Sequence, residues 1–583
     1  MRPDQQCAPA AANPKAPSLS SPLTLPCGQE LPNRLMKAAL SEGLGDTSGL
    51  PDERLENLYR RWSDGSFGLI VTGNVMVHRG HLGEPGNVVL EADSALDGFR
   101  RWAKVTQDGG SPIWMQLNHP GRQANPIATA GPTVAPSAVA VGIPGMPAPR
   151  ALTDGEISGI VDRFAASAAR AEEAGFDGVQ IHGAHGYLVS QFLSPLANIR
   201  TDRWGGDIEG RSRFLLEIVR RVRGAVGPGF GVGIKLNSAD FQRGGFTEEE
   251  SRAVIEMLAD EAIDLIEISG GSYESPAMMG RPGVSASTRA REGYFLEYAE
   301  TVRSLARAVP LAVTGGFRTR AGMQGALDSG ACDVIGIGRP TAIAPTAGPA
   351  LLKGTRQSLP QRSLRLPVPR RLASNSSVRS LEGALDLQWH TDQLHRMGAA
   401  KEPDVDRPLW RTAITTVQRN GIDGVRHKRG AASAKSSHST TSAAVRKFRF
   451  ERAVGRYVAN PVVGFAQRLG IRTTFATELE TTGRKSGELR TVPVAAAFDA
   501  TGAWVISQHG TRSGWAYNIA AQPTVRIRQG ENWRTGTAVF VTDDDPRLRA
   551  RTFAAHPLFA PLVAAGFAAL ASDPVSVRIT FTD

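Results

Sequence analysis

Residues 177–187 read Asp-Gly-Val-Gln-Ile-His-Gly-Ala-His-Gly-Tyr. The first five residues form a mainly apolar run that predicts a buried strand, and His182, His185 and Tyr187 follow it directly. Neutral imidazoles can donate hydrogen bonds to a carbonyl oxygen, and a phenol can supply a proton. A polar loop would explain one histidine, but three protic groups within six residues of a strand end indicate a catalytic site.

Apolar runs of similar length recur on both sides of this stretch. The eight runs, in chain order, are Leu35–Leu40, Phe67–Thr72, Ile113–Leu117, Gly178–Ile181, Val232–Leu236, Leu265–Ile268, Leu311–Thr314 and Val334–Ile337. Most are separated by stretches long enough for a helix, and residues 158–174 have helical periodicity. Eight strands alternating with helices predict an α/β fold, the (β/α)8 or TIM barrel, whose catalytic residues lie at the C-terminal strand ends.

The segment from His182 to Gly206 resembles the old yellow enzyme family of flavin-dependent oxidoreductases. The resemblance covers about residues 20–420, and it implies bound FMN, NAD(P)H as reductant and reduction of the C=C bond of an enone or enal. It also implies that His182 and His185 bind the carbonyl oxygen while Tyr187 protonates the α-carbon. Oxidative demethylation or a dehydrogenase direction is the alternative for Tyr187.

Two glycine-rich segments indicate where a phosphate would bind. Gly315-Gly-Phe-Arg318 follows the seventh run, and Gly336-Ile-Gly-Arg-Pro340 follows the eighth. Glycines at strand ends let backbone N–H groups approach an anion, and phosphate sites of TIM barrels commonly lie after these two strands. The chain has no Gly-x-Gly-x-x-Gly element that opens a helix after a strand, which favours a mononucleotide. The resemblance assigns the FMN phosphate to Gly315, Gly316, Gly338 and Arg339.

Other strand ends carry the expected contacts of the flavin ring. Lys235 ends the fifth run with a cation, and Gln116 ends the third with both a donor and an acceptor. The resemblance implies flavin contacts at six positions, which are Ala38, Ala39, Ser41, Gly73, Gln116 and Lys235. Relatives have Thr or Cys where Ser41 stands, and that residue tunes the flavin through a hydrogen bond.

Composition limits the other functions. The net charge is +11, but Arg426–Arg449 holds seven basic and no acidic residues among small polar ones, which predicts a flexible linker and no nucleic-acid partner. The three cysteines, Cys7, Cys27 and Cys332, are far apart, which fits a reducing cytoplasm and excludes the iron–sulfur cluster of the larger relatives. We expect no metal site, and no apolar run is long enough to span a bilayer.

The length predicts at least two domains. We expect a disordered leader over 1–20, the FMN-binding barrel over 21–420, a basic linker over 421–445 and a second domain over 446–583. Residues 446–470 could form an amphipathic helix that packs on its own domain or contacts a membrane surface.

The second domain is predicted to be a small, mostly antiparallel β structure. Its strand-like runs are Val492–Phe498, Ala503–Ser507, Thr524–Arg528, Thr537–Val541 and Val575–Phe581. A turn ahead of them concentrates hydroxyl groups and cations and is either a phosphate cradle or an exposed basic hairpin; it contains Arg484, Lys485, Ser486 and Arg490.

Residues 465–583 resemble the deazaflavin-dependent nitroreductase family, which are split β-barrels that bind coenzyme F-420. The resemblance implies that Arg484, Lys485, Ser486 and Arg490 face the coenzyme's phosphate or polyglutamate tail and that Trp515 flanks its ring. The whole chain is therefore expected to be a bifunctional oxidoreductase with a shared substrate or electron supply. The alternative is that the barrel is the only enzyme and the second domain is a ligand-binding or membrane-docking module.

Overall fold

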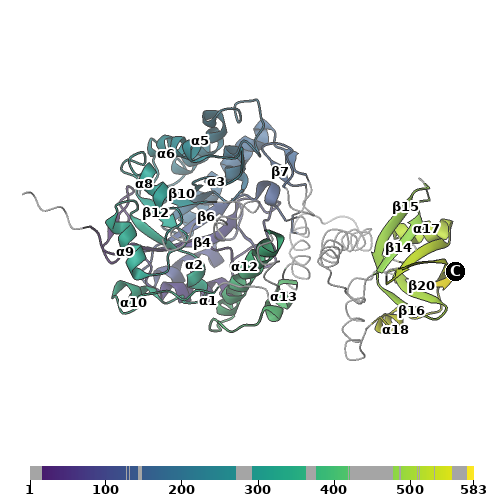
Figure 1. The fold of residues 1–583 in the computed structure, drawn as a ribbon. Coiled ribbons are helices and arrows are strands. Elements are labelled where there is room, and N and C mark those ends of the chain that lie inside the picture. The colour runs from purple at the N-terminus through teal and green to yellow at the C-terminus, as the bar shows by residue number, and fades with distance from the viewer. Residues whose placement is uncertain are drawn as a thin grey trace, which may run out of the picture. The chain divides into compact units, whose positions relative to one another are not determined.

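The computed structural model describes residues 16–125, 128–129, 132–141, 148–270, 292–362, 376–417, 419, 477–484, 487–507, 510, 513–530, 532–553 and 574–582. The chain divides into two compact units, residues 1–435 and 436–583, which are described separately (Figure 1). The predicted linker 421–445, the segment 446–470 and the residues Lys485 and Ser486 lie outside the described residues.

The first unit is a closed barrel of eight parallel strands, which confirms the predicted fold class (Figure 1). In chain order the strands are β3 (Leu35–Lys37), β4 (Leu69–Met76), β6 (Ile113–Asn118), β9 (Gly178–Gly183), β10 (Gly231–Asn237), β11 (Leu265–Ser269), β12 (Leu311–Thr314) and β13 (Val334–Ile337). The barrel closes because β3 pairs in parallel with both β13 and β4. A short strand, β5 (Val88–Val89), adds to β4. Each predicted apolar run overlaps one of the eight strands, and five of the strands extend beyond the predicted bounds.

Amphipathic helices surround the strands. They are α1 (Glu53–Ser63), α2 (Asp97–Gln107), α3 (Asp154–Glu173), α5 (Ile208–Arg223), α6 (Glu248–Ala259), α8 (Leu296–Val302), α9 (Arg320–Asp328) and α12 (Ser376–Gly398). The predicted helix at 158–174 is α3, which begins with a capping box between Thr153 and Glu156. Shorter helices, α4 (Leu188–Leu193), α10 (Gly348–Leu352) and α13 (Leu409–Val417), lie in the connections.

Trp114 of β6 fills the barrel interior and is fully buried. A Cβ atom at Gly231 would lie 2.2 Å from its ring, so only glycine fits beside it. The N-terminal hairpin β1–β2 (Leu23–Thr24 and Glu30–Leu31) packs against the barrel interior, because Leu25 and Leu31 belong to the same buried cluster as Trp114. Leu19, which we expected within the disordered leader, is also fully buried, so ordered packing begins before residue 21.

The second unit contains one antiparallel sheet with the order β15-β14-β18-β19-β20-β17-β16. Its strands are β14 (Thr477–Thr482), β15 (Leu489–Val494), β16 (Ala496–Asp499), β17 (Gly502–Ser507), β18 (Thr524–Gln529), β19 (Asn532–Val541) and β20 (Val575–Phe581). The edge strands β15 and β16 are separated in the chain by Ala495 alone, so the sheet must curl until its edges meet. In the described part of this unit two helices accompany the sheet, α17 (Gly514–Ala521) and α18 (Pro546–Arg551).

Two sequence interpretations in this unit were wrong in detail. β14 was not predicted, because its sequence Thr477-Glu-Leu-Glu-Thr-Thr482 is almost entirely polar. Only two of its side chains are buried. The single predicted strand 492–498 is two strands, because the chain changes partner at Ala495. In the described part of the chain, no helix is both long and apolar enough to cross a membrane.

Candidate active site at the C-terminal mouth of the barrel

His182, His185 and Tyr187 are brought together at the end of β9. The ring centroids of His182 and His185 are 5.1 Å apart, and those of His182 and Tyr187 are 4.8 Å apart. His182 is the fifth residue of β9, and Tyr187 is the N-cap of α4. His185 lies between them with a φ of 62°, a left-handed conformation that turns the chain sharply toward α4.

Both histidines are neutral. Burial, with smaller contributions from the neighbouring His185 and from the charge of Lys235, holds the pKa of His182 well below its usual value. Burial and Lys235 lower the pKa of His185 to about 3. The Ala184 N–H donates to Nδ1 of His182 at 3.3 Å, so the proton of the neutral ring is on Nε2. Nε2 of His185 is 2.9 Å from the hydroxyl oxygen of Ser269. Each imidazole can therefore present an N–H donor.

Asn74 connects Tyr187 to the loop that follows β3. Its amide nitrogen lies 3.4 Å from the Tyr187 hydroxyl oxygen and 3.2 Å from the Ser41 hydroxyl oxygen. Ser41 in turn donates a short hydrogen bond to the carboxylate of Glu84. Because this proton is used by Glu84, the Ser41 hydroxyl is arranged to accept from Asn74. Burial raises the pKa of Glu84, which the Ser41 bond opposes.

The predicted flavin residues Gln116 and Lys235 belong to one buried network. Gln116 Nε2 donates to Gln180 at 2.7 Å, and Gln180 Nε2 donates to Glu267 at 2.7 Å. Lys235 forms an ion pair with Glu267 at 2.8 Å, and the side chain of Glu267 is fully buried. The chain thus holds a cation at the mouth by balancing it with a carboxylate from the neighbouring strand β11.

Glu42 and Lys37 fix the loop that carries Ala38, Ala39 and Ser41. The buried Glu42 carboxylate accepts from the Gly73 N–H at 2.9 Å and from the Tyr59 hydroxyl. A Cβ atom at Gly73 would lie 1.8 Å from Glu42 Oε2, so Gly73 is required for this contact. Burial lowers the pKa of Lys37 to about 7, which Glu42 opposes, and burial raises the pKa of Glu42. The loop is therefore clamped to β4 by buried hydrogen bonds.

Gly315 and Gly316 have φ values of 134° and 90°, which favour glycine. The rings of Phe295 and Tyr294 pack against these glycines, and Cβ atoms there would lie 3.1 and 3.0 Å from them. Glycine therefore suits both positions because of their positive φ and because of the close aromatic rings. Arg339 forms an ion pair with Asp386 of α12 at 2.6 Å and remains partly exposed.

The mouth fits a phosphorylated flavin on observations independent of the family resemblance. The hydroxyl oxygen of Thr314, directly before the glycine pair, is buried and has no hydrogen-bond partner among the described residues. The ammonium group of Lys235 has three N–H donors, and its ion pair with Glu267 is made through one carboxylate oxygen. Arg339 supplies a further cation after β13. The sites of Gln116, Lys235, Thr314 and Arg339 could thus hold the two ends of such a cofactor.

Several residues of this site were not predicted from the sequence. Asn74, Asn118, Gln180, Glu267 and Ser269 all lie in strands of the barrel. The available signal was a polar residue within or just after a buried apolar run, because such a side chain needs a partner. Its partner comes from another strand, which the run itself does not identify.

Three histidines that the sequence analysis did not connect also lie together. His78 and His81 follow β4, His119 follows β6, and one nitrogen of each lies within 4.8 Å of the others. The Gly121 N–H donates to His119 Nδ1 at 3.1 Å, so a neutral His119 carries its proton on Nε2. Coordination by three nitrogens would require this bond to break, and the present arrangement supports the turn at Gly121.

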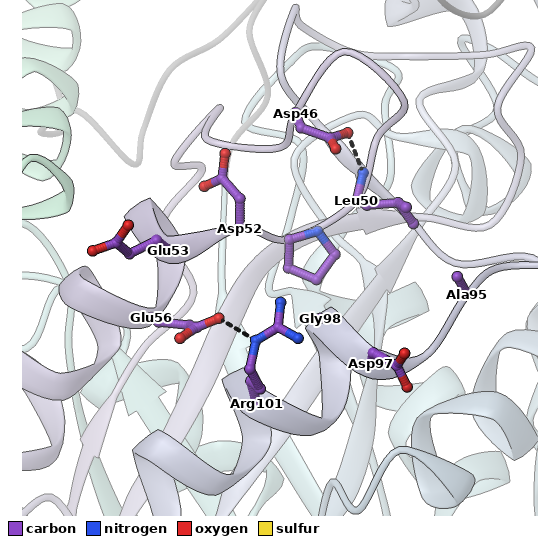
Figure 2. A pocket seen from close by; sticks show the side chains of 10 residues that line it. Asp46, Leu50, Asp52, Glu53, Glu56, Ala95, Asp97, Gly98 and Arg101 are labelled. Atoms are coloured by element: carbon purple, nitrogen blue, oxygen red, sulfur yellow. Dashed lines mark hydrogen bonds and ion pairs between the residues drawn. The ribbon is translucent and has the colours of Figure 1, made fainter.

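A separate surface pocket of about 560 Å³ lies between the N-termini of α1 and α2 (Figure 2). Its walls carry the carboxylates of Asp46, Asp52, Glu53 and Asp97, and Glu56 is 2.8 Å from Arg101. Its lining includes no residue of the predicted active site.

In the second unit, the predicted cofactor turn joins β14 to β15 and packs on α17. Asn518 holds it, because its Oδ1 accepts from the Arg484 N–H at 3.3 Å and its Nδ2 donates to Thr481 at 3.1 Å. The Arg484 guanidinium lies 4.4 Å from the ring centre of Tyr517. Arg490 is exposed on β15, and Trp515 is partly buried against the core of this unit.

A flavin-dependent oxidoreductase is the class of protein that this barrel and its mouth define. The family model described as NADH:flavin oxidoreductase / NADH oxidase matches residues 18–357, and the chain belongs to this family, the old yellow enzyme family. The model of the F-420H(2)-dependent quinone reductase family matches residues 456–561. The chain is therefore an NADH:flavin oxidoreductase with a fused domain of the deazaflavin-dependent type.

Several known proteins are similar to the barrel part of this chain. The NADH-dependent flavin oxidoreductase iliE of Hypocrea jecorina (strain QM6a) is 39% identical over 56% of this chain and 86% of its own length. The NADH-dependent flavin oxidoreductase iccE of Talaromyces variabilis is 38% identical over 56% of this chain and 84% of its own length. The solved old yellow enzyme homologue from Zymomonas mobilis is 25% identical, with a TM-score of 0.52 over 62% of this chain and 99% of its own.

Proposed function

We propose that the barrel binds FMN and uses NADH or NADPH to reduce the C=C bond of an α,β-unsaturated carbonyl compound. The observation that carries the proposal is the grouping of two neutral, buried imidazoles and one phenol around the end of β9. FMN, when bound, supplies the hydride chemistry that no side chain provides. Its phosphate end is assigned to Gly315, Gly316, Gly338 and Arg339, and its ring end to Ala38, Ala39, Ser41, Gly73, Gln116 and Lys235.

The residues of the chain have separate roles in this proposal. His182 and His185 hold the carbonyl oxygen with N–H donors, which draws electron density from the alkene. Tyr187 donates its proton to the α-carbon, where the developing enolate is basic enough to accept it. Low imidazole pKa values keep both histidines as neutral donors throughout the physiological pH range. Lys235, balanced by Glu267, favours negative charge at the ring end.

The test uses the purified FMN-containing protein with NADH and 2-cyclohexen-1-one, with product analysis for cyclohexanone. A Tyr187→Phe variant should reduce the enone at least about 10²-fold more slowly, because it lacks the general acid. Tyr298→Phe is the matched control, since Tyr298 is a buried barrel tyrosine whose hydroxyl bonds to Ser251 at 2.6 Å. An absence of cyclohexanone would refute this function, and a Tyr187→Phe rate equal to that of the native protein would refute the role of Tyr187 as proton donor.

We further infer that the second unit is a deazaflavin-dependent reductase, which the family match at 456–561 supports. The protein should be made in a host that synthesises deazaflavin, and the cofactors extracted and quantified per chain. One FMN plus bound deazaflavin supports two reductase sites. FMN alone would instead favour a ligand-binding or docking module, the alternative function of this unit.

A further inference from the structure

Two buried asparagines at the barrel mouth have side-chain amide atoms without a hydrogen-bond partner in the described part of the chain. Asn118 is 1% exposed, and neither its Nδ2 nor its Oδ1 has a hydrogen-bond partner among the described residues. Asn74 is 8% exposed, and its Oδ1 likewise has no partner within the described ranges. A buried amide without partners is costly and is rare in native proteins, so each case calls for an explanation.

Strand geometry places both side chains at the mouth. Trp114, Gln116 and Asn118 alternate along β6, so they share the face that Trp114 presents to the barrel interior. Asn118 is the last residue of the strand and therefore lies nearest the C-terminal opening. Asn74 pairs with Gln116 in the β4–β6 register, after an irregularity in β4 between Val71 and Asn74. Its amide nitrogen reaches the hydroxyl of Tyr187 at 3.4 Å.

Other buried asparagines of the barrel show what a structural role requires. Asn198 donates to the carbonyl oxygens of Phe192 and Trp204, both at 2.8 Å, and orders the loop after α4. Asn33 donates to Ser66 and accepts from two backbone N–H groups. Among the described residues the Asn118 side chain has no comparable hydrogen bond, so their packing does not explain why this position is an amide.

We propose that Asn74 and Asn118 form an amide subsite that binds a neutral group having both a hydrogen-bond donor and an acceptor, namely a hydroxyl or a carboxamide. The proposal rests on the proposed function, because the group belongs to a compound that occupies the mouth beside Tyr187. The subsite offers donor protons from Asn118 Nδ2 and two acceptor oxygens, Asn118 Oδ1 and Asn74 Oδ1. A ligand group satisfies these atoms only if it both donates and accepts.

A carboxylate fits this subsite poorly. It accepts hydrogen bonds only, and it would face two amide carbonyl oxygens. The cation at the mouth, Lys235, is already balanced by Glu267. The subsite should therefore select against a negative charge as well as for a polar neutral group. Two compounds could supply a carboxamide, the alkene substrate and the nicotinamide of the reductant.

The test measures kcat/KM of the holoenzyme for a series of 2-cyclohexen-1-one derivatives with hydrogen, hydroxyl, carboxamide or carboxylate at one ring carbon. The native protein should prefer the hydroxyl or carboxamide compound to the unsubstituted enone and should disfavour the carboxylate. Asn118→Leu should reduce that preference about tenfold, the equivalent of one hydrogen bond. Asn57→Leu, on α1 and outside the mouth, is the control and should retain it.

A second measurement separates the two sources of the carboxamide. Rapid mixing with NADH reports flavin reduction, and an Asn118→Leu effect on the NADH concentration dependence alone would assign the subsite to nicotinamide. An unchanged preference together with unchanged NADH dependence would overturn the proposal. A loss of FMN per chain in Asn118→Leu, with both selectivities retained, would also overturn it, because the amides would then serve the flavin.

The proposal remains testable if the protein reduces no enone. Calorimetric titration of the holoenzyme with cyclohexanone carboxamide and with the matching carboxylate measures binding without turnover. Tighter binding of the carboxamide, lost in Asn118→Leu, supports the subsite even if the proposed function fails. Equal binding of the two compounds refutes the subsite even if enones are reduced.

Discussion

The side-chain amide of Asn74 donates a hydrogen bond to the hydroxyl oxygen of Tyr187 at a distance of 3.4 Å. This contact joins β4 to the N-cap of α4, two elements more than a hundred residues apart in the chain. Because the amide donates to the phenol oxygen, it favours the tyrosinate that remains after proton transfer. The phenolic proton of Tyr187 takes no part in this contact, because the amide is the donor. Asn74 is therefore a positioning residue for the proposed proton donor.

Replacing Asn74 with Leu should slow enone-dependent reoxidation of the reduced enzyme about tenfold, since one hydrogen bond to the proton donor is lost. The alkaline limb of the pH–rate profile should move to higher pH, because the tyrosinate is no longer stabilised. Single-turnover kinetics between pH 6 and 10 provide the measurement. A lower rate with an unshifted alkaline limb would contradict a role through Tyr187.

Replacing Glu267 with Gln should make the midpoint potential of the bound flavin more positive. The substitution leaves the buried cation of Lys235, 2.8 Å away, without its counter-charge, which stabilises a reduced anionic cofactor. A change of about 1.4 kcal/mol corresponds to about 30 mV for a two-electron couple. Equilibration with reference dyes measures it, and a more negative potential would refute the assignment of Lys235 to the ring end.

Protonation of buried histidines should make the barrel sensitive to acid. Burial lowers the pKa of His395 to about 3, and its Nε2 lies 2.8 Å from the Glu42 carbonyl oxygen. Between pH 6.5 and about 3 the unfolded chain binds a proton at this residue that the native state does not. Through this residue the free energy of unfolding should therefore fall by about 1.4 kcal/mol for each pH unit of acidification. The slope reaches this full value below about pH 6, where the unfolded chain is protonated at His395.

His395→Gln tests this linkage, because glutamine is neutral at every pH and can still donate to the Glu42 carbonyl. Urea unfolding of the variant should show a shallower pH dependence than the native protein between pH 4.5 and 6.5, and a parallel one above pH 7. Parallel curves across the whole range would show that His395 is not neutral in the native state.

Asn198→Leu and Asn118→Leu should have different effects on stability. The first removes two hydrogen bonds to buried carbonyl oxygens and should cost about 2–4 kcal/mol. The second removes two unpartnered amide atoms and should leave the holoenzyme equally or more stable. Thermal unfolding without substrate provides the comparison. Similar destabilisation by both substitutions would mean that Asn118 supports the fold.

Arg484→Ala should weaken deazaflavin binding by the second unit about tenfold, because one cation of the proposed cradle is lost. Arg526→Ala is a suitable control, since Arg526 lies in the same sheet and pairs with Glu480 at 3.0 Å. Fluorescence titration with the coenzyme measures both variants. Equal loss in the two would indicate a general effect of charge, and no loss in either would place the coenzyme elsewhere.

The amino-acid sequence by itself determined the architecture of the barrel. Each strand contains a short apolar run, and helices such as α3 carry their own caps, so the pattern is local and can be read along the chain. The grouping of His182, His185 and Tyr187 was also predictable, because all three follow one strand within six residues. The sequence did not predict β14, whose polar residues become a strand through pairing with β15 and β18.

Only the tertiary structure decided which polar residues meet. Glu267 lies within a predicted apolar run and Asn118 directly follows one, and their roles depend on neighbours from other strands. Closure of the barrel sets the register that brings Glu267 to Lys235 and Asn74 to Tyr187. Side-chain pairing across a sheet depends on distance in space, which the local pattern of one strand does not contain.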